Sequence, residues 1–577
     1  MRILLLTHAF NSLTQRLFGD LRDRGHDVSV EFDINDRVTE EAVALFGPEL
    51  VIAPFLKRAI PESVWRAHRC IVLHPGVPGD RGPSALDWAI TRDERTWGVT
   101  AMQANGEMDA GDIWASVPFA MRRTTKSSLY RNEVTDAAGE AIAQALRRLE
   151  EPEFRPKPLD YTHGDIEGRW RPPMSQGDRA IDWEHDGTEA ILRKVRAADG
   201  APGVLDTIAG ERCYLYGAHA DGRLRGKVPG AILAQRDGAI CLATRDAAVW
   251  ITHLKRADET GTFKLPAATA LDGRLVNVTE DVLPAHRTVG HATWREIEYI
   301  ERGPVGFLHF RFYNGAMSTT QCVRLRRAYR YARSRPTRVI ALMGGDDFWS
   351  NGIDLNAIEA SGRPAEESWR NINAMNDLVR DIIETPRQLT IAALAGNAGA
   401  GGVFLALAAD RVMARDGIVL NPHYKSMGNL YGSEYWTYLL PRRVGASAVP
   451  IVVDNRLPLG VRRAAAIGLV DQCVNPDGAP FATAVEDVAL ALARYKRFGG
   501  LLDAKNARRA RDEARKPLAA YRNEELGRMR LNFFGFDPSY HVARYNFVRK
   551  IAHSRTPLHL AVHRKVAAAS SRELSLA

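Results

Sequence analysis

The sequence is poor in cysteine and has no paired cysteines. Five cysteines are spread over 577 residues, at Cys70, Cys213, Cys241, Cys322 and Cys473. A zinc site or a disulfide framework needs closely and regularly spaced cysteines, and no C-x-x-C or H-E-x-x-H motif is present. We therefore expect no bound metal, and isolated thiols are typical of a protein from the reducing cytoplasm.

Export signals and membrane spans are also lacking. The opening MRILLLTHAF has too short an apolar run for a signal peptide and predicts a first buried strand. Residues 389–409 form a long uncharged stretch that could cross a bilayer by length alone. It contains four glycines, Gly396, Gly399, Gly401 and Gly402, and each disfavours a continuous helix by about 1 kcal/mol relative to alanine. We expect no membrane segment.

Basic residues exceed acidic ones, giving a formal net charge of +9 and a pI of about 9.3. The basic side chains are scattered, and the densest group, KNARRARDEARK near residue 510, carries acids at helical spacing. That pattern favours a solvated helix face over a nucleic-acid site. A small phosphorylated ligand remains compatible with such a surface.

Strand and helix patterns divide the chain into four predicted parts. MRILLLT, SLTQRLFGDLRDRGH and DVSVEF alternate strand, helix and strand, which opens a parallel α/β sheet over residues 1–165. A proline-rich and charged segment, 151–176, predicts a linker, and short strands with Gly and Asp turns predict a β-rich domain over 178–285. A second α/β domain follows over 292–480, and a helical extension over 481–577.

Two glycine turns connect strands to helices in the third part. After the strand LTIAALA, a glycine turn leads to a helix that begins near Gly401, and after TRVIALM the turn GGDDFWSNG leads to a helix near Ile353. Neither G-x-G-x-x-G nor a P-loop lysine is present. Backbone N–H groups at such turns can stabilise an anion, although two ordinary βα turns would have the same pattern.

The motifs DDFWSNGIDLNAI, AALAGNAGAGGVFLALAADRVMA and AAAIGLVDQCV resemble the crotonase (enoyl-CoA hydratase/isomerase) superfamily over about residues 296–480. The resemblance implies a ββα-spiral domain that binds an acyl-CoA thioester, with an oxyanion hole formed by the N–H groups of Ile353 and Gly401. The two hydratase glutamates are missing: Phe404 stands at the first place and the segment NPHYK at the second. Simple hydration of a double bond is therefore not expected.

Three residues near this second position are candidates for proton transfer. Tyr424 and Glu434 pair an acid with a base, because burial would raise the pKa of the carboxyl toward neutrality, and His423 is a candidate for a supporting role. The alternative is that Tyr424 is a core aromatic residue and Glu434 an ion-paired or surface acid.

CIVLHPGVPGDRGPSALDWAI and WGVTAMQANGEMDAGDIWAS resemble the 10-formyltetrahydrofolate-dependent formyltransferases over about residues 1–160. The resemblance implies a Rossmann-like domain with His74 and Asp109 as catalytic residues. A histidine oriented by a carboxylate can move protons and stabilise an oxyanion. The asparagine of the family is replaced by Val72, and Arg81 is either a supporting residue or a loop ion pair.

The β-rich part resembles the small barrel-like second domain of the formyltransferases. The order of all parts resembles the family of hydrogenase maturation factors called HypX or HoxX. That resemblance implies a bifunctional cytoplasmic enzyme that passes a formyl group from 10-formyltetrahydrofolate to coenzyme A and then splits formyl-CoA into carbon monoxide and CoA. Its expected partners are small-molecule substrates and other hydrogenase maturation proteins. A hydrolase that releases formate, or a non-catalytic scaffold that delivers a formyl group, stays an alternative.

Overall fold

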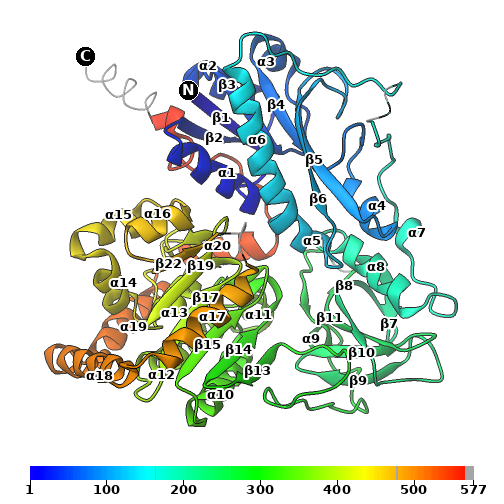
Figure 1. Ribbon diagram of the computed structural model, residues 1–577. Helices are drawn as coiled ribbons and strands as arrows, with labels where there is room; N and C mark the ends of the chain where they lie inside the picture. Colours follow the sequence, from blue (N-terminus) through cyan, green and yellow to red (C-terminus); the bar gives the residue numbers. More distant parts are fainter. Residues whose placement is uncertain (163, 165, 259, 476–478, 566–577) are drawn as a thin grey trace.

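The computed structural model describes residues 1–565 apart from 163, 165, 259 and 476–478. Residue 165, the predicted end of the first part, and residues 566–577, the end of the last part, lie outside the described residues. The chain forms three sheet-containing regions in sequence order and a set of C-terminal helices (Figure 1).

The first region is a six-stranded sheet in the order β2-β1-β3-β4-β5-β6. Its strands are β1 (Arg2–Thr7), β2 (Asp27–Phe32), β3 (Leu50–Phe55), β4 (Cys70–His74), β5 (Thr96–Gln103) and β6 (Ile113–Ala120). The first four strands are parallel, as the sequence predicts, but β5 runs antiparallel to both of its neighbours, β4 and β6. A short connection joins β5 to β6, and short connections produce antiparallel pairs because a parallel return needs a long crossover.

The helices of this region are α1 (Ser12–Asp23), α2 (Asp36–Phe46), α3 (Glu62–Ala67), α4 (Ala85–Thr91), α5 (Lys126–Leu129), the π-helix η1 (Tyr130–Val134) and α6 (Thr135–Leu149). The sequence predicts one continuous helix where α5, η1 and α6 follow one another. A π-helical turn widens the helix locally and is often found at functional sites.

The predicted linker forms no helix or strand over its described residues 151–175, but it is not detached. Its backbone pairs with the glycine-rich loop after β4: Gly168 N–H donates to Pro78 at 2.9 Å, and Arg171 N–H donates to Arg81 at 3.0 Å. This pairing attaches the linker to the end of β4.

The second region is an antiparallel sheet in the order β7-β8-β11-β10-β9, with β12 paired to β11. Its elements are α7 (Gln176–Arg179), α8 (Thr188–Ala198), β7 (Val204–Ile208), β8 (Glu211–Asp221), β9 (Ile232–Arg236), β10 (Ala239–Ala243), β11 (Ala248–Arg256), β12 (Leu265–Pro266) and α9 (Ala267–Ala270). Apolar residues of α8 and α9 pack on the sheet and form one core with it.

The third region contains two sheets, in the orders β13-β14-β15-β17-β19-β22 and β16-β18-β20-β21. The strands are β13 (Ile297–Arg302), β14 (Val305–Phe310), β15 (Val339–Gly344), β16 (Phe348–Ser350), β17 (Leu389–Leu394), β18 (Asn397–Gly399), β19 (Arg411–Arg415), β20 (Val419–Asn421), β21 (Leu459–Gly460) and β22 (Gln472–Val474). The helices are η2 (Tyr313–Gly315), α10 (Thr319–Ser334), α11 (Leu355–Ala360), α12 (Pro364–Ile383), α13 (Gly401–Leu407), α14 (Trp436–Val444), η3 (Ala446–Ala448), α15 (Val449–Asp454) and α16 (Val461–Ala466). This repetition of two strands and a helix agrees with the predicted ββα-spiral.

Helices follow, as the sequence predicts, among them α17 (Phe481–Arg494), α18 (Phe498–Arg515), α19 (Leu518–Phe534) and α20 (Ser539–Val548). None of the helices among the described residues is both long and apolar enough to span a membrane.

After α20 the chain returns to the first region, where the red C-terminal segment lies beside the blue N-terminal strands (Figure 1). Val30 N–H donates to the carbonyl of Leu560 at 3.1 Å, and Phe32 N–H donates to Thr556 Oγ1 at 2.8 Å. The buried pair Glu31 Oε2–His563 Nε2, at 3.0 Å, lies between these bonds. The segment thus covers β2, the edge strand of the first sheet, which would otherwise expose unpaired backbone groups.

Candidate functional site

One continuous cavity of about 2190 Å³ joins the first and third regions. Its wall includes His74 and Asp109 of the first region and Ile353, Gly401, Tyr424 and Glu434 of the third, so the structure brings six predicted residues to one cavity. Ligand pockets usually measure roughly 300–1,000 Å³. The cavity is therefore large enough for two ligands, or for one long ligand that reaches both sets of residues.

His74 is the last residue of β4 and is 5% exposed. Its Nδ1 lies 3.5 Å from Asp109 Oδ2, and that carboxylate also accepts a hydrogen bond from Gly82 N–H at 3.1 Å. The backbone of Asp109 is left-handed, with φ of 51°, which turns the side chain back toward β4. The predicted histidine and acid are thus neighbours although 35 residues separate them.

A second carboxylate contacts His74 from the other side. His74 Nε2 and Asp80 Oδ2 form a buried hydrogen bond of 3.0 Å, and Arg171 of the linker lies 3.3 Å from Asp80 Oδ1. Sequence reasoning missed both residues. Asp80 could have been predicted, because it follows His74 by six positions in a glycine-rich loop. Nothing in the sequence connects Arg171 to Asp80.

Val72 and Arg81, the two remaining positions that the sequence singled out in this region, differ in whether they line the cavity. Val72, which replaces the asparagine of the formyltransferases, is part of the cavity wall. Arg81 is not among the described residues that line the cavity. It forms an ion pair of 2.6 Å with Glu107 and donates to the carbonyl of Met108 at 3.0 Å.

The two glycine turns of the third region meet at the cavity. Gly352, with φ of 81°, precedes Ile353, and Ala400, with φ of 47°, precedes Gly401 at the start of α13. The turns approach closely, because a β-carbon on Gly352 would lie 3.3 Å from the backbone nitrogen of Gly401. Within the described part of the chain, no acceptor pairs with the N–H groups of Ile353 or Gly401. Both groups can therefore donate to an oxygen in the cavity.

Tyr424 and Glu434 form a buried hydrogen-bonded pair. The Tyr424 hydroxyl donates to Glu434 Oε2 at 2.5 Å, and the side chains are 8% and 2% exposed. Burial raises the pKa of Glu434 to about 7, against a smaller opposite effect of the Tyr424 and Ser433 hydrogen bonds. Burial beside Glu434 also raises the pKa of Tyr424 well above its usual value. Near neutral pH the glutamate can therefore gain or lose a proton, while the tyrosine keeps its own.

Phe404, at the place of a hydratase glutamate, stacks on Tyr424 with a ring separation of 5.3 Å. The apolar ring contributes to the burial of the pair.

The backbone of Glu434 is strained and is held by two buried side chains. Glu434 and Tyr435 have φ of 63° and 58°, a left-handed conformation that costs roughly 1–3 kcal/mol per residue. Asn376 Oδ1 accepts from Glu434 N–H at 2.6 Å, and Glu525 of α19 accepts from Tyr435 N–H at 2.9 Å. Sequence reasoning missed both supporting residues, which come from distant helices.

His423 lines the cavity, and neither ring nitrogen has a hydrogen-bond partner among the described residues. Burial lowers its pKa to about 4, so the imidazole is neutral at neutral pH. Among the same residues, no group of three or more His, Cys, Asp or Glu side chains is arranged to hold a metal ion.

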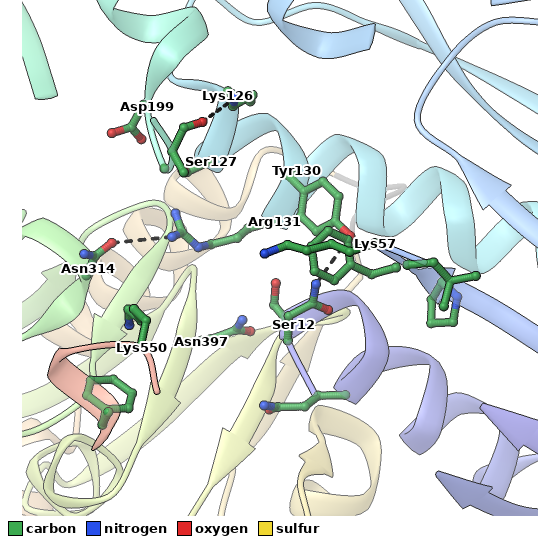
Figure 2. A pocket seen from close by; sticks show the side chains of 18 of the residues that line it. Ser12, Lys57, Lys126, Ser127, Tyr130, Arg131, Asp199, Asn314, Asn397 and Lys550 are labelled. Carbon is green, nitrogen blue, oxygen red and sulfur yellow. Dashed lines mark hydrogen bonds between the residues drawn. The ribbon is translucent and has the colours of Figure 1, made fainter. Parts of the chain in front are cut away.

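Basic side chains from separate segments line the cavity (Figure 2). Lys57 follows β3, Arg131 belongs to η1 and Lys550 follows α20. Arg131 Nη2 donates to Asn314 Oδ1 at 3.4 Å, a bond between the first and third regions. These residues were not predicted, because only the folded chain brings them together. Their combined charge is suited to an anionic ligand.

Three family models match the chain: Formyl transferase over residues 20–146, Formyl transferase, C-terminal domain over 173–262, and Enoyl-CoA hydratase/isomerase over 310–494. The methionyl-tRNA formyltransferase of Carboxydothermus hydrogenoformans is 25% identical over 225 residues, covering 38% of this chain and 71% of the relative.

Two similarities extend over almost the entire chain. The hydrogenase maturation factor HoxX of Bradyrhizobium diazoefficiens is 54% identical over 564 residues, which cover 98% of this chain and 97% of the relative. The crystal structure of HypX from Aquifex aeolicus in complex with tetrahydrofolic acid superimposes with a TM-score of 0.94 at 48% identity, covering 98% of this chain and 99% of that one.

The order of the matched models, and the extent of these two similarities, agree with the fold and with the cavity between its first and third regions. The chain belongs to the HypX/HoxX family of hydrogenase maturation factors.

Proposed function

We propose that this protein makes carbon monoxide for the active site of [NiFe]-hydrogenase in two steps. The first step transfers the formyl group of 10-formyltetrahydrofolate to the thiol of CoA, and the second splits formyl-CoA into carbon monoxide and CoA. We assign formyl transfer to the proposed domains 1–165 and 178–285. We assign the splitting of formyl-CoA to the proposed domain 292–480, which 481–577 follows as a helical extension.

The observation that carries this proposal is the single cavity shared by both candidate sites. The product of a formyl transfer to CoA is a thioester, and the paired N–H groups of Ile353 and Gly401 suit the oxygen of a thioester. A formyl-CoA formed beside His74 would remain in the same cavity as Glu434. The relative whose crystal structure contains tetrahydrofolic acid supports folate as the carrier.

In the first step the CoA sulfur attacks the formyl carbon, while His74 takes the thiol proton. The bond between the formyl carbon and the folate nitrogen then breaks, and the proton moves to that nitrogen. Asp109 stabilises the imidazolium that forms in between, at 3.5 Å from Nδ1.

In the second step the thioester oxygen accepts from Ile353 and Gly401, and the Glu434 carboxylate removes the formyl proton. The carbon–sulfur bond breaks, carbon monoxide leaves, and Tyr424 protonates the departing thiolate. Their hydrogen bond of 2.5 Å then returns the proton from Glu434 to Tyr424, so both residues recover their starting state. The overall change is formyl-CoA to carbon monoxide and CoA.

Lys57, Arg131 and Lys550 are suited to the phosphates of CoA, since they bring positive charge to the cavity that both candidate sites share. A ligand anchored by its phosphates at this position can extend its flexible thiol arm along the cavity. The sequence alone did not identify which basic residues would contact the phosphates.

Incubation of the full-length protein with 10-formyltetrahydrofolate and CoA, with ferrous haemoglobin as an optical trap, tests the proposal. We expect a carbonyl-haem spectrum that requires both substrates. Donor consumption with release of formate and no carbonyl-haem would favour the hydrolase, whereas no consumption without a maturation partner would favour the delivery scaffold.

A further inference from the structure

Asp80 stands behind His74, on the side away from the cavity. It is 1% exposed and, unlike His74 and Asp109, is not part of the cavity wall among the described residues. Its Oδ2 is 3.0 Å from His74 Nε2, whereas Asp109 lies 3.5 Å from Nδ1. The imidazole is therefore bonded to a buried carboxylate through one nitrogen, and its other nitrogen faces the cavity side.

The local sequence leaves room for this contact. A β-carbon on Gly76 would lie 2.5 Å from Cδ2 and Nε2 of His74 and 2.7 Å from Asp80 Oδ2. A side chain at position 76 would thus separate the histidine from the acid. The backbone of Gly76 is not left-handed, so its conformation does not require glycine. Glycine is needed here because it has no side chain to block the contact between His74 and Asp80.

The linker holds Asp80 in place. Arg171, only 9% exposed, lies 3.3 Å from Asp80 Oδ1 and places its guanidinium over the ring of Trp97, 5.6 Å from the centroid. Gly168 packs against the backbone of Asp80 so closely that no β-carbon fits. The charge of Asp80 is therefore neutralised by a cation that the folded linker delivers.

We propose that Asp80 is the positioning residue of His74 in formyl transfer, and that Arg171 positions Asp80. Nε2–H donates to Asp80, which leaves the lone pair on Nδ1 to receive the thiol proton. The kinetic part of this inference rests on the proposed transfer to CoA.

A buried carboxylate beside a histidine selects its tautomer and stabilises its cationic form, as in the Ser-His-Asp triad. A purely structural ion pair would contribute to stability but leave the proton positions on His74 and the turnover rate unchanged. Measurements on the ring nitrogens therefore separate the two roles.

Two variants disturb the arrangement in different ways. Asp80→Asn removes the charge and keeps the shape, while Gly76→Ala keeps every charge and pushes the two side chains apart. Asp182→Asn, which alters the exposed pair between Asp182 and His185 at 2.8 Å, is the control. Each full-length protein carries [¹⁵N]-histidine, and His74→Asn identifies the His74 signals.

For both test variants we expect kcat for formyl-CoA formation to fall about 100-fold or more, with KM for both substrates within threefold. The wild-type ring spectrum should show a proton on Nε2 of His74, and both variants should lose that preference. Carbon monoxide release from supplied formyl-CoA should be unchanged in both variants, and the control should keep the wild-type His74 signals, with changes confined to His185.

A folded Asp80→Asn protein with kcat within threefold of wild type, or with unchanged His74 signals, would overturn the inference. If Asp80→Asn does not fold, the same criteria apply to Gly76→Ala. A wild-type protein that forms no formyl-CoA would overturn the proposed function and the kinetic part together, while the ring spectra would still decide whether Asp80 sets the tautomer of His74.

Discussion

The two candidate sites use their carboxylates in opposite ways. At the first site, Asp80 and Asp109 flank His74, and Arg171 forms an ion pair with Asp80. At the second site, Glu434 has a tyrosine as its hydrogen-bond partner and no cation among the causes of its pKa shift. The acids of the first site thus lie beside a histidine and a cation, whereas burial raises the pKa of Glu434 to about 7.

The difference also concerns how each site is held. His74 and its two acids lie on one sheet edge and its loops, within about a hundred residues of chain together with Arg171. Glu434 depends on Asn376 and Glu525, from helices α12 and α19, to hold a left-handed backbone. The second site is therefore more sensitive to packing between distant elements.

Replacing Glu434 by glutamine should separate the two steps most clearly. Glu434 lines the cavity, forms a hydrogen bond with Tyr424, and has a pKa that burial raises to about 7. We expect carbon monoxide release to fall roughly 10³- to 10⁴-fold, while formyl-CoA accumulates at the wild-type rate. Chromatography of CoA esters with a haemoglobin trap measures both. Loss of formyl-CoA formation as well would contradict the division of labour.

His74→Asn is the complementary change. Formyl-CoA formation should fall roughly 10²- to 10³-fold, less than the loss at Glu434, because Asp109 remains beside the reacting atoms. The variant should release carbon monoxide normally when formyl-CoA is supplied. An equal loss in both assays would show that the sites are not independent.

The pH dependence of carbon monoxide release should report on desolvation at the second site. Glu434 acts as a base only when deprotonated, so the rate should rise with pH and level off above about 7. Tyr424→Phe removes a hydrogen bond that lowers the pKa of Glu434, and should move the midpoint to higher pH in addition to slowing the reaction. Single-turnover rates with supplied formyl-CoA measure the profile. A midpoint that moves to lower pH would contradict this assignment.

Glu31→Gln should change stability and leave both rate constants nearly unaffected. Glu31 is fully buried against His563, Arg564 and Thr556, and the hydrogen bonds of these groups lower its pKa despite its burial. A lowered folded-state pKa contributes stability above the unfolded value near 4.5, and this contribution is lost as the pH falls.

At pH 7 the loss of this buried pair should cost about 3 kcal/mol, seen as a lower transition temperature in calorimetry. Glu62→Gln, in the exposed pair with Arg66, is the matched control and should change stability by less than about 1 kcal/mol. An equal effect of both substitutions would show that the C-terminal segment does not stabilise the first sheet.

Local patterns were enough to predict much of the fold. Strand β2 has the predicted bounds, α1 begins at the predicted Ser12 but ends at Asp23, three residues earlier than predicted, and α13 begins at Gly401 as the glycine turn predicts. The antiparallel orientation of β5 and β6 was not foreseen, because a short apolar strand carries no signal of its direction. The π-helix η1 was missed for a similar reason: its residues have the same helical periodicity as α6.

The candidate sites show the same limit. His74, Asp109, Ile353 and Gly401 stand in motifs with fixed spacing, so their proximity was predictable, and their catalytic roles stay predictions. For Glu434 the sequence alone was compatible with a buried base or with a surface acid. The residue is 2% exposed, so its environment is the buried one. For Arg81 they left a supporting residue and an ion pair open, and the structure contains the ion pair with Glu107.

By itself the sequence determined the element types, the two glycine turns and the motif residues, because these follow from side-chain periodicity and backbone freedom over a few neighbouring residues. Only the tertiary structure decided which distant groups meet: Arg171 with Asp80, Glu525 with the backbone of Tyr435, the basic side chains along the cavity wall, and the C-terminal segment with β2. Those contacts depend on burial and on long-range packing, and no local pattern encodes the partner of a buried charge.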